Sequence, residues 1–298
     1  MTSPRFGHLL TAMVTPFHED GSLSLDAAAD VARFLVEQGN DALVVAGSTG
    51  EGSALSDVEK LDLFAAVAEA VTVPVLAGST SSDTARSVEL TSRVAGTGVA
   101  GVLCTTPAYA RPSQRGLSAH FAAVAQSTDL PIMLYDIPVR TGRKIAPETT
   151  MAVVRDHANV VALKDASGDV VAAAALAAQL GDALDLYSGD DALVLAFLAI
   201  GAVGLVSVAA HWAAPEFAEL IRCALAGDWV RARELNQRVA PSCRFESSEL
   251  YPNPLPSKAA LRALGRDVGQ CRLPLGPSDE VLDQSARDVV SALVAARG

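Results

Sequence analysis

Lys164 is the residue with the clearest potential for chemistry in this sequence. It ends the apolar run Val160–Leu163, whereas the other three lysines, Lys60, Lys144 and Lys258, occur in helix or loop contexts where we expect solvated side chains. Burial lowers the pKa of a lysine, and the neutral amine is the form that attacks a carbonyl carbon. Lys164 is therefore a candidate nucleophile. The alternative is a strand-end lysine whose ammonium reaches solvent past its own apolar stem.

Further polar residues follow other apolar runs. Tyr135 ends the run before that of Lys164, and its phenol could transfer a proton; it is otherwise a core tyrosine with a satisfied hydroxyl. The Gly47–Glu51 loop offers backbone N–H groups and the hydroxyls of Ser48 and Thr49 to a carboxylate, although such a loop is also an ordinary turn. Arg140 could hold a second carboxylate through two hydrogen bonds, or it is a surface arginine.

Histidines show no spacing typical of metal ligands, so we predict no metal site. They are His8, His18, His120, His157 and His211.

These residues need a scaffold, and the chain alternates short apolar strands with longer alanine-rich helical stretches. Strands that are apolar throughout favour a parallel sheet covered by helices on both faces. Eight such cycles within about 230 residues predict an α/β fold of the (β/α)8 TIM-barrel type, whose chemistry lies at the C-terminal ends of the strands. The competing doubly wound sheet lacks a G-x-G-x-x-G turn after its first strand. The expected strands are Leu9–Val14, Ala42–Ala46, Pro74–Ala77, Gly101–Cys104, Pro131–Tyr135, Val160–Lys164, Leu184–Tyr187 and Gly204–Val208.

Helix starts are expected between these strands, several of them with capping residues. Ser56 and Glu59 have the spacing of a capping box, and Pro147 suits a first helical turn. The expected starts lie near Leu25, Ser56, Ser82, Ser113, Pro147, Asp169, Asp191 and Pro215.

The strands stop near Gly227, which divides the chain into a catalytic barrel, residues 1–227, and a helical C-terminal extension, residues 228–298, packed on it. We expect about three helices in the extension, with a proline-rich joint at Tyr251–Pro256. The longest apolar run, Ala192–Val206, is shorter than the ~20 residues of a membrane-spanning helix and is interpreted as one buried helix followed by one buried strand.

The composition excludes some classes of partner. A net charge of −11 and a pI of about 4.9 argue against binding to nucleic acid or to an anionic membrane. The four cysteines, Cys104, Cys223, Cys243 and Cys271, are far apart and contain no C-x-x-C pair. Together with an N-terminal segment, Thr2–Arg5, that does not resemble a signal peptide, they predict free buried thiols in a cytoplasmic protein.

Taken together, these motifs resemble the dihydrodipicolinate synthase / N-acetylneuraminate lyase superfamily. The resemblance rests on Gly47–Glu51, Tyr135–Pro138, Leu163–Asp165 and Ser188–Asp191, and it extends over nearly the whole chain to Asn253–Lys258. It implies a (β/α)8 lyase that binds pyruvate covalently as a Schiff base on a lysine, here Lys164, without a separate cofactor.

Three features resemble the synthase subgroup of that superfamily. Arg140 matches an arginine that holds the carboxylate of the aldehyde, Tyr109 matches a tyrosine that completes a proton relay across a dimer interface, and Ser188–Asp191 has the synthase form. The implied reaction condenses pyruvate with L-aspartate 4-semialdehyde to 4-hydroxy-tetrahydrodipicolinate, in the lysine and diaminopimelate pathway. The alternatives are another pyruvate-dependent lyase or aldolase and, less expected, a non-catalytic paralogue.

The resemblance also assigns roles to the remaining site residues. Tyr135, Ser48 and Tyr109 would form the proton relay. Ser48 and Thr49 would bind the pyruvate carboxylate, and Gly189 and Val206 would line the pocket through their backbones. The family further implies a homotetramer made of two tight dimers.

Four positions depart from the family pattern. Ser48 replaces a threonine that is usual in synthases, and Ala108 replaces the first of two tyrosines. Relatives regulated by lysine carry an asparagine and an acidic residue where this chain has Ser82 and Arg86. Because Arg86 should repel the ammonium of lysine, we predict that lysine does not inhibit this protein.

Overall fold

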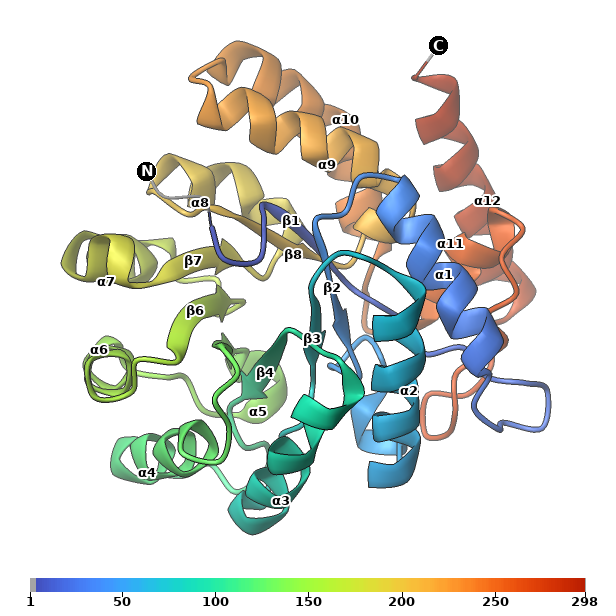
Figure 1. The fold of residues 1–298 in the computed structure, drawn as a ribbon. Coiled ribbons are helices and arrows are strands. Elements are labelled where there is room, and N and C mark those ends of the chain that lie inside the picture. The colour runs from blue at the N-terminus through green and yellow to red at the C-terminus, as the bar shows by residue number, and fades with distance from the viewer. Residues whose placement is uncertain (1–3, 298) are drawn as a thin grey trace.

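The structure, a computed structural model, describes residues 4–297 as a closed barrel of eight strands joined in chain order (Figure 1). Every neighbouring pair of strands is parallel, including the pair of β8 with β1 that closes the barrel. The predicted (β/α)8 fold is confirmed, and the strand limits lie within two residues of those expected. The strands are β1 (Leu9–Ala12), β2 (Ala42–Val45), β3 (Val75–Ala77), β4 (Gly101–Thr105), β5 (Ile132–Asp136), β6 (Val160–Asp165), β7 (Asp185–Ser188) and β8 (Gly204–Ser207).

Helices follow the strands and surround the barrel, as Figure 1 shows. The capping box at Ser56 is present, Pro147 occupies the first helical turn, and Ser113 and Asp169 are N-caps, so most of the expected starts are confirmed. The helices are α1 (Leu25–Glu37), α2 (Asp57–Ala70), α3 (Thr84–Val94), α4 (Gln114–Ala125), α6 (Pro147–Asp156), α7 (Val170–Leu180), α8 (Val194–Ala199) and α9 (Ala210–Leu225).

Two helical features differ from expectation. The start near Pro215 is wrong, because α9 begins at Ala210, where the Ser207 hydroxyl accepts a hydrogen bond from the Ala210 N–H. Pro215 lies inside α9, and the non-helical backbone at Ala213 accommodates it. An additional short helix, α5 (Pro138–Thr141), follows β5 directly.

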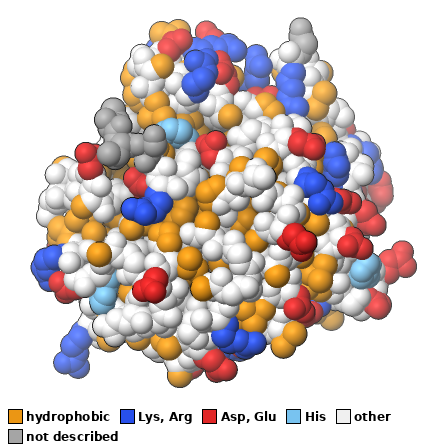
Figure 2. Space-filling model, viewed as in Figure 1, with side chains coloured by type: hydrophobic (Ala, Val, Ile, Leu, Met, Phe, Trp, Pro, Cys, Tyr) orange, Lys and Arg blue, Asp and Glu red, His pale blue; other side chains and the backbone are white. Residues whose placement is uncertain are grey.

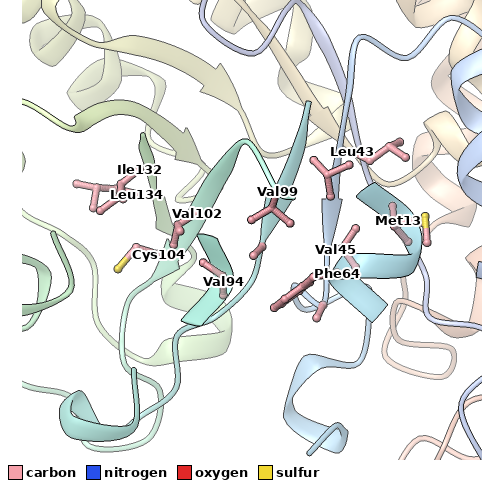
Figure 3. Close-up of a cluster of buried hydrophobic side chains, with 14 of the residues drawn as sticks. Met13, Leu43, Val45, Phe64, Val94, Val99, Val102, Cys104, Ile132 and Leu134 are labelled. Carbon is pink, nitrogen blue, oxygen red and sulfur yellow. The ribbon is translucent and has the colours of Figure 1, made fainter. Parts of the chain in front are cut away.

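Apolar residues fill both faces of the strands. Leu10, Val44, Met133 and Val206 belong to the cluster inside the barrel, whereas Leu9, which precedes Leu10, packs outward against the helices. Figure 3 shows the outer layer between β2, β4, β5 and their helices, with Val45, Phe64, Val102 and Leu134 among its side chains. Burial on both faces explains why the strands are apolar throughout.

Three further helices form the C-terminal segment, as expected: α10 (Trp229–Phe245), α11 (Leu255–Ala263) and α12 (Glu280–Ala295). Helix α10 packs against α9, and α11 packs against α12. The run Ala192–Val206 forms α8 and β8, so its interpretation as a helix followed by a strand is confirmed.

Figure 2 shows apolar side chains over the central part of the viewed face and charged side chains mostly toward its edge. No helix within residues 4–297 is long and apolar enough to cross a membrane. The four cysteines are free, but Cys243 is only half-buried, so its predicted burial is wrong. Met1–Ser3 and Gly298 lie outside the described residues, and with them part of the N-terminal segment considered above.

Candidate active site

Lys164 and Tyr135 lie side by side at the C-terminal ends of β6 and β5. The strand register pairs the two residues directly, which confirms the predicted neighbourhood. The Lys164 ammonium lies 4.2 Å from the centroid of the Tyr135 ring, and only 3% of Lys164 is exposed. A lysine at this position does not reach solvent, so the solvated alternative for Lys164 is excluded.

Burial sets the protonation of the Lys164 amine. Desolvation lowers its pKa to about 8, and the positive charge of Arg140 acts in the same direction. The negative charges of Asp191 and Glu246 act against this shift. A substantial fraction of the amine is therefore neutral near physiological pH, which is the state that adds to a carbonyl.

Tyr135 is also buried, and desolvation raises the pKa of its phenol to about 12. Arg140 and a hydrogen bond from Ser48 moderate this increase. The Tyr135 phenol therefore stays protonated at neutral pH. The Ser48 hydroxyl, in the loop after β2, is half-buried. Tyr135 and Ser48 thus form a hydroxyl pair beside the Lys164 amine, as the proposed relay requires.

The loop after β2 presents Ser48 and Thr49 through an unusual backbone. Ala46 and Glu51 adopt left-handed backbone conformations, with φ of 54° and 52°. Such conformations are costly for residues other than glycine and are found where the surrounding structure imposes them. The Thr15 hydroxyl supports the loop by donating a 2.6 Å hydrogen bond to the Gly50 carbonyl.

Asn253 connects the C-terminal segment to this loop. Its Nδ2 donates a 2.9 Å hydrogen bond to the Thr49 hydroxyl, and its carbonyl accepts one of 3.2 Å from Arg140 Nη2. Asn253 therefore contacts two of the predicted substrate-binding residues at once. Asn253 belongs to the segment Asn253–Lys258 that resembles the family, but the sequence alone indicates no role for it.

Arg140 lies on α5 and is exposed. Its charge nevertheless lowers the pKa values of both Lys164 and Tyr135, so it is electrostatically part of the site. Its bond to Asn253 leaves further N–H donors of the guanidinium for a ligand.

Gly189 and Val206 lie at the same end of the barrel interior. A Cβ at Gly189 would meet Lys164 Cγ and Ala166 Cβ at 2.9 Å, so only glycine leaves room for the Lys164 side chain. Val206 is fully buried in the apolar cluster that also contains Tyr135.

A pair of buried carboxyl groups, Asp191 and Glu246, was missed by sequence reasoning. Asp191 accepts hydrogen bonds from the Ser207 hydroxyl and from the Val208 N–H at 2.8 Å. Burial raises the pKa values of both carboxyl groups, that of Glu246 most clearly, and the negative charge of Asp191 raises the pKa of Glu246 further. The negative charges of both carboxyl groups oppose the lowering of the Lys164 pKa.

Tyr109 does not join the other relay residues within a single chain. It is 96% exposed and has a left-handed backbone, with φ of 68°, as does Arg111, with φ of 47°. Within its own chain the Tyr109 side chain is therefore open to solvent, in a loop whose backbone is left-handed at two non-glycine residues.

A cavity of about 600 Å³ opens at the C-terminal ends of β2, β3, β4 and β5. It reaches Ser48, Thr106, Arg140 and Asn253 at one end and the residues between α2 and α3 at the other. Ser48 lines the cavity and its hydroxyl moderates the raised pKa of the Tyr135 phenol, whereas Tyr135 and Lys164 are not themselves lining residues.

The expectation that the other lysines are solvated is wrong for two of them. Lys60 is 4% exposed and Lys258 is 1% exposed, and only Lys144, which pairs with Asp169, has a side chain that is about one-third exposed. The positive charge of Lys258 is compensated by Glu51, whose Oε1 lies 2.7 Å from the ammonium. Burial of these lysines depends on partners or packing far away in the sequence.

The fold and the site together define a (β/α)8 barrel with a desolvated lysine amine and a hydroxyl pair at the C-terminal ends of its strands. Comparison with known proteins agrees with this class. Residues 5–293 match the model of the dihydrodipicolinate synthetase family, and the chain belongs to that family.

Similar proteins cover essentially the whole chain. The 4-hydroxy-tetrahydrodipicolinate synthase of Symbiobacterium thermophilum is 43% identical over 290 residues, which are 97% of this chain and 98% of that protein. The enzyme of the same name from Mycobacterium leprae is 45% identical over 293 residues, covering 97% of this chain and 96% of its own. The lysine-bound structure of the Cyanidioschyzon merolae protein superposes with a TM-score of 0.95 at 38% identity, over 98% of this chain and 99% of that one.

Proposed function

We propose that this protein is a 4-hydroxy-tetrahydrodipicolinate synthase that condenses pyruvate with L-aspartate 4-semialdehyde through a Schiff base on Lys164. The observation that carries the proposal is the Lys164 amine: it is 3% exposed, has a pKa lowered to about 8, and lies 4.2 Å from the centroid of the Tyr135 ring. A cavity lined by Ser48 and Arg140 opens at the same end of the barrel. Relatives that are 43% and 45% identical bear the name of this enzyme.

In the first step, the neutral Lys164 amine attacks the ketone carbon of pyruvate. The carbinolamine loses water to give an imine, and Tyr135 supplies the proton that the departing hydroxide needs. Ser48 and Thr49 offer hydroxyls and backbone N–H groups to the pyruvate carboxylate, and Asn253 orients the Thr49 hydroxyl for this role.

In the second step, loss of a methyl proton turns the imine into an enamine, whose carbon attacks the aldehyde. Arg140 holds the carboxylate of aspartate semialdehyde through guanidinium N–H groups that Asn253 leaves free. The amine of the bound product then replaces Lys164 at the imine carbon, so the product cyclises and the lysine is released. The imine serves as the electron sink, so no separate cofactor is needed.

The proton relay requires a third hydroxyl, and Tyr109 is its proposed source. Because Tyr109 is 96% exposed on its own chain, we propose that it enters the site of a second copy in a tight dimer. Two such dimers would form the homotetramer. A variant that is monomeric should lose most of its activity, and a fully active monomer would contradict this arrangement.

Two further proposals concern organisation. We propose that residues 228–298 form one extension of the barrel formed by residues 1–227, which is supported by the bonds of Asn253 and Lys258 to the β2 loop. The free cysteines among the described residues suit a reducing compartment, so we propose that the enzyme acts in the cytoplasm.

A condensation assay with pyruvate and aspartate semialdehyde, coupled to a reductase that consumes the product, tests the proposal. Turnover is expected for the wild type and none for Lys164→Ala. A protein that forms the pyruvate imine but turns over only a sialic acid or a keto sugar acid would instead be a lyase or aldolase of the same family. Imine formation without turnover of any of these would indicate a non-catalytic paralogue.

A further inference from the structure

Asp136 and Asp165 end β5 and β6, each one residue beyond the two central residues of the site. The strand register pairs Asp136 with Asp165, just as it pairs Tyr135 with Lys164. Successive side chains of a strand point to opposite faces, so the two carboxyl groups point out of the barrel, whereas Tyr135 belongs to the cluster inside it. Asp136 is 3% exposed and Asp165 is 5% exposed. Two acidic groups are thus buried side by side on neighbouring strands.

A small cavity of about 10 Å³ lies between the ends of these strands and the helices α6 and α7. Asp136, Asp165, Lys144 and Thr150 are among its lining residues. A cavity of this size has room for about one water molecule. Within residues 4–297, neither carboxyl group has a cationic side chain at ion-pairing distance, because the Lys144 ammonium lies 2.6 Å from Asp169 Oδ2 instead. The two buried acids therefore lack a close counter-charge.

Burial determines the protonation of the two acids. It raises the pKa of Asp136 to about 7, and the negative charge of Asp165 acts in the same direction, while the Ile145 N–H and Lys144 act against it. Burial also raises the pKa of Asp165, with Asp169 acting in the same direction and Lys144 against it. Two like charges in one buried space are unfavourable, so the two acids hold a proton between them below about pH 7.

The Asp136 side chain also closes the segment that carries Arg140. Its Oδ1 accepts a 3.1 Å hydrogen bond from the Ile145 N–H, nine positions further along the chain. Residues 137–144, which include α5 and Arg140, lie between the two ends of this bond. The bond therefore fixes the end of the segment, just before α6, against its beginning at the end of β5.

A protonated Asp136 can bond to both neighbours at once. One oxygen accepts from the Ile145 N–H, while the O–H donates toward Asp165 across the cavity, directly or through one water molecule. Loss of the proton to solvent would leave two anions in the same buried space, and their repulsion would disturb the alignment of Asp136 with Ile145.

We propose that Asp136 is a positioning residue: with a proton that it shares with Asp165, its carboxyl group closes residues 137–144 and so sets the position of the Arg140 guanidinium. The inference rests on the proposed function, in which Arg140 holds the carboxylate of the aldehyde. Asp136 acts through Arg140 and does not contact the substrate. Binding of pyruvate, at Lys164 and the loop after β2, should depend on it much less.

Steady-state kinetics of the condensation tests this role. Asp136→Ala is expected to raise the KM for aspartate semialdehyde about fivefold or more, as for one lost hydrogen bond, with a smaller change in the KM for pyruvate. Asp136→Asn keeps an acceptor for Ile145 and a donor for Asp165 without a proton that titrates, so it should restore most of the wild-type value. Asp182→Asn, a change in an exposed acid just beyond α7, is the matched control and should alter neither KM.

The pH dependence distinguishes a shared proton from an ordinary contact. The KM for aspartate semialdehyde of the wild type, divided by that of Asp136→Asn, should rise as the pH increases through about 7. Because folding raises the pKa of Asp136, the wild type should also lose stability relative to Asp136→Asn as the pH rises from about 4 to about 7, seen as a lower urea midpoint. If Asp136→Ala does not fold, these comparisons with Asp136→Asn decide the question.

Unchanged KM values in Asp136→Ala, or equal changes for both substrates, would overturn the inference. So would an Asp136→Asn variant as impaired as Asp136→Ala, or a KM ratio and a difference in urea midpoint that do not depend on pH. Failure of the proposed function is a different result: the wild type itself would then not condense the two substrates, which would overturn the reaction and the inference together.

Discussion

Lys164 and Lys258 occupy similar surroundings, yet we propose a chemical role for Lys164 and a structural role for Lys258. They are 3% and 1% exposed, and each ammonium lies over an aromatic ring, 4.2 Å from the centroid of Tyr135 and 4.3 Å from that of Phe17. Only Lys258 has a carboxylate beside it, Glu51 at 2.7 Å, and a carbonyl acceptor, Gln270, at 2.9 Å. Burial alone does not make a lysine reactive; the difference lies in whether the amine has partners that hold its proton.

Replacing Lys164 should produce the largest effect. Lys164→Ala removes the only proposed covalent anchor for pyruvate, so condensation should fall by about four orders of magnitude or more, as for other catalytic nucleophiles. Stability should not fall in parallel, because the amine makes no ion pair among the described residues. The rate is measured in the coupled assay and the unfolding midpoint in urea. Residual activity within tenfold of the wild type would contradict the assignment.

Replacing Lys258 should have the opposite result, a loss of stability with imine formation retained. Lys258→Met leaves Glu51 buried without its ammonium, which should reduce the free energy of unfolding by about 3–5 kcal/mol, measured by urea denaturation. The folded variant should still form the imine on Lys164. The double variant Lys258→Met, Glu51→Leu should regain part of the stability. A loss of imine formation at unchanged stability would show that the two lysines had been assigned the wrong roles.

Replacing Arg140 should change the KM for one substrate more than the KM for the other. Arg140→Ala is expected to raise the KM for aspartate semialdehyde by roughly ten- to a hundredfold through loss of a charged hydrogen bond, with a smaller change for pyruvate. Arg143→Ala, a change three residues further along the chain, is the matched control. Equal effects of Arg140→Ala on both substrates would argue against a role in aldehyde binding.

The pH profile should report the lowered pKa of Lys164. Because the neutral amine is reactive, the rate of imine formation should rise with pH, by about tenfold per unit well below the pKa, and become constant above about 8. The rate is measured by quenching with borohydride at early times. A midpoint near 10, the ordinary value for lysine, would contradict the effect of burial.

The smallest expected effect is that of lysine. Millimolar lysine should leave turnover unchanged, because Arg86 places a positive charge where a lysine ligand would bring its own. The relative from Cyanidioschyzon merolae, whose structure contains lysine, is the natural positive control. Substantial inhibition of this protein at that concentration would refute the prediction.

The fold and the central lysine could be predicted because their signals are local in the sequence. Apolar strands alternate with helical stretches, and a polar residue that follows such a strand must lie at the end of the barrel where strands end together. This reasoning placed Lys164 beside Tyr135, as the register confirms. It also placed Ser48 and Thr49 in the loop after β2.

Other features could not be predicted because they depend on contacts between distant segments. Lys258 reads as an ordinary helical lysine until Glu51, some two hundred positions earlier, lies beside it. Asn253 bonds to Thr49 across a similar separation, and Glu246 meets Asp191 only through the packing of α10 on the barrel. No local pattern in the sequence marks these residues. The helix start predicted near Pro215 was wrong for a different reason: proline is more common at the start of a helix than in its interior, but Pro215 lies inside α9.

The most direct test is to incubate the protein with pyruvate, reduce it with borohydride, and locate the adduct by peptide mass spectrometry. The contrast between Lys164 and Lys258 predicts a single modified residue, Lys164, and no adduct in Lys164→Ala. An adduct on Lys60 or Lys258, or no adduct at all in the wild type, would contradict the central claim that Lys164, the buried amine beside the Tyr135 ring, is the nucleophile.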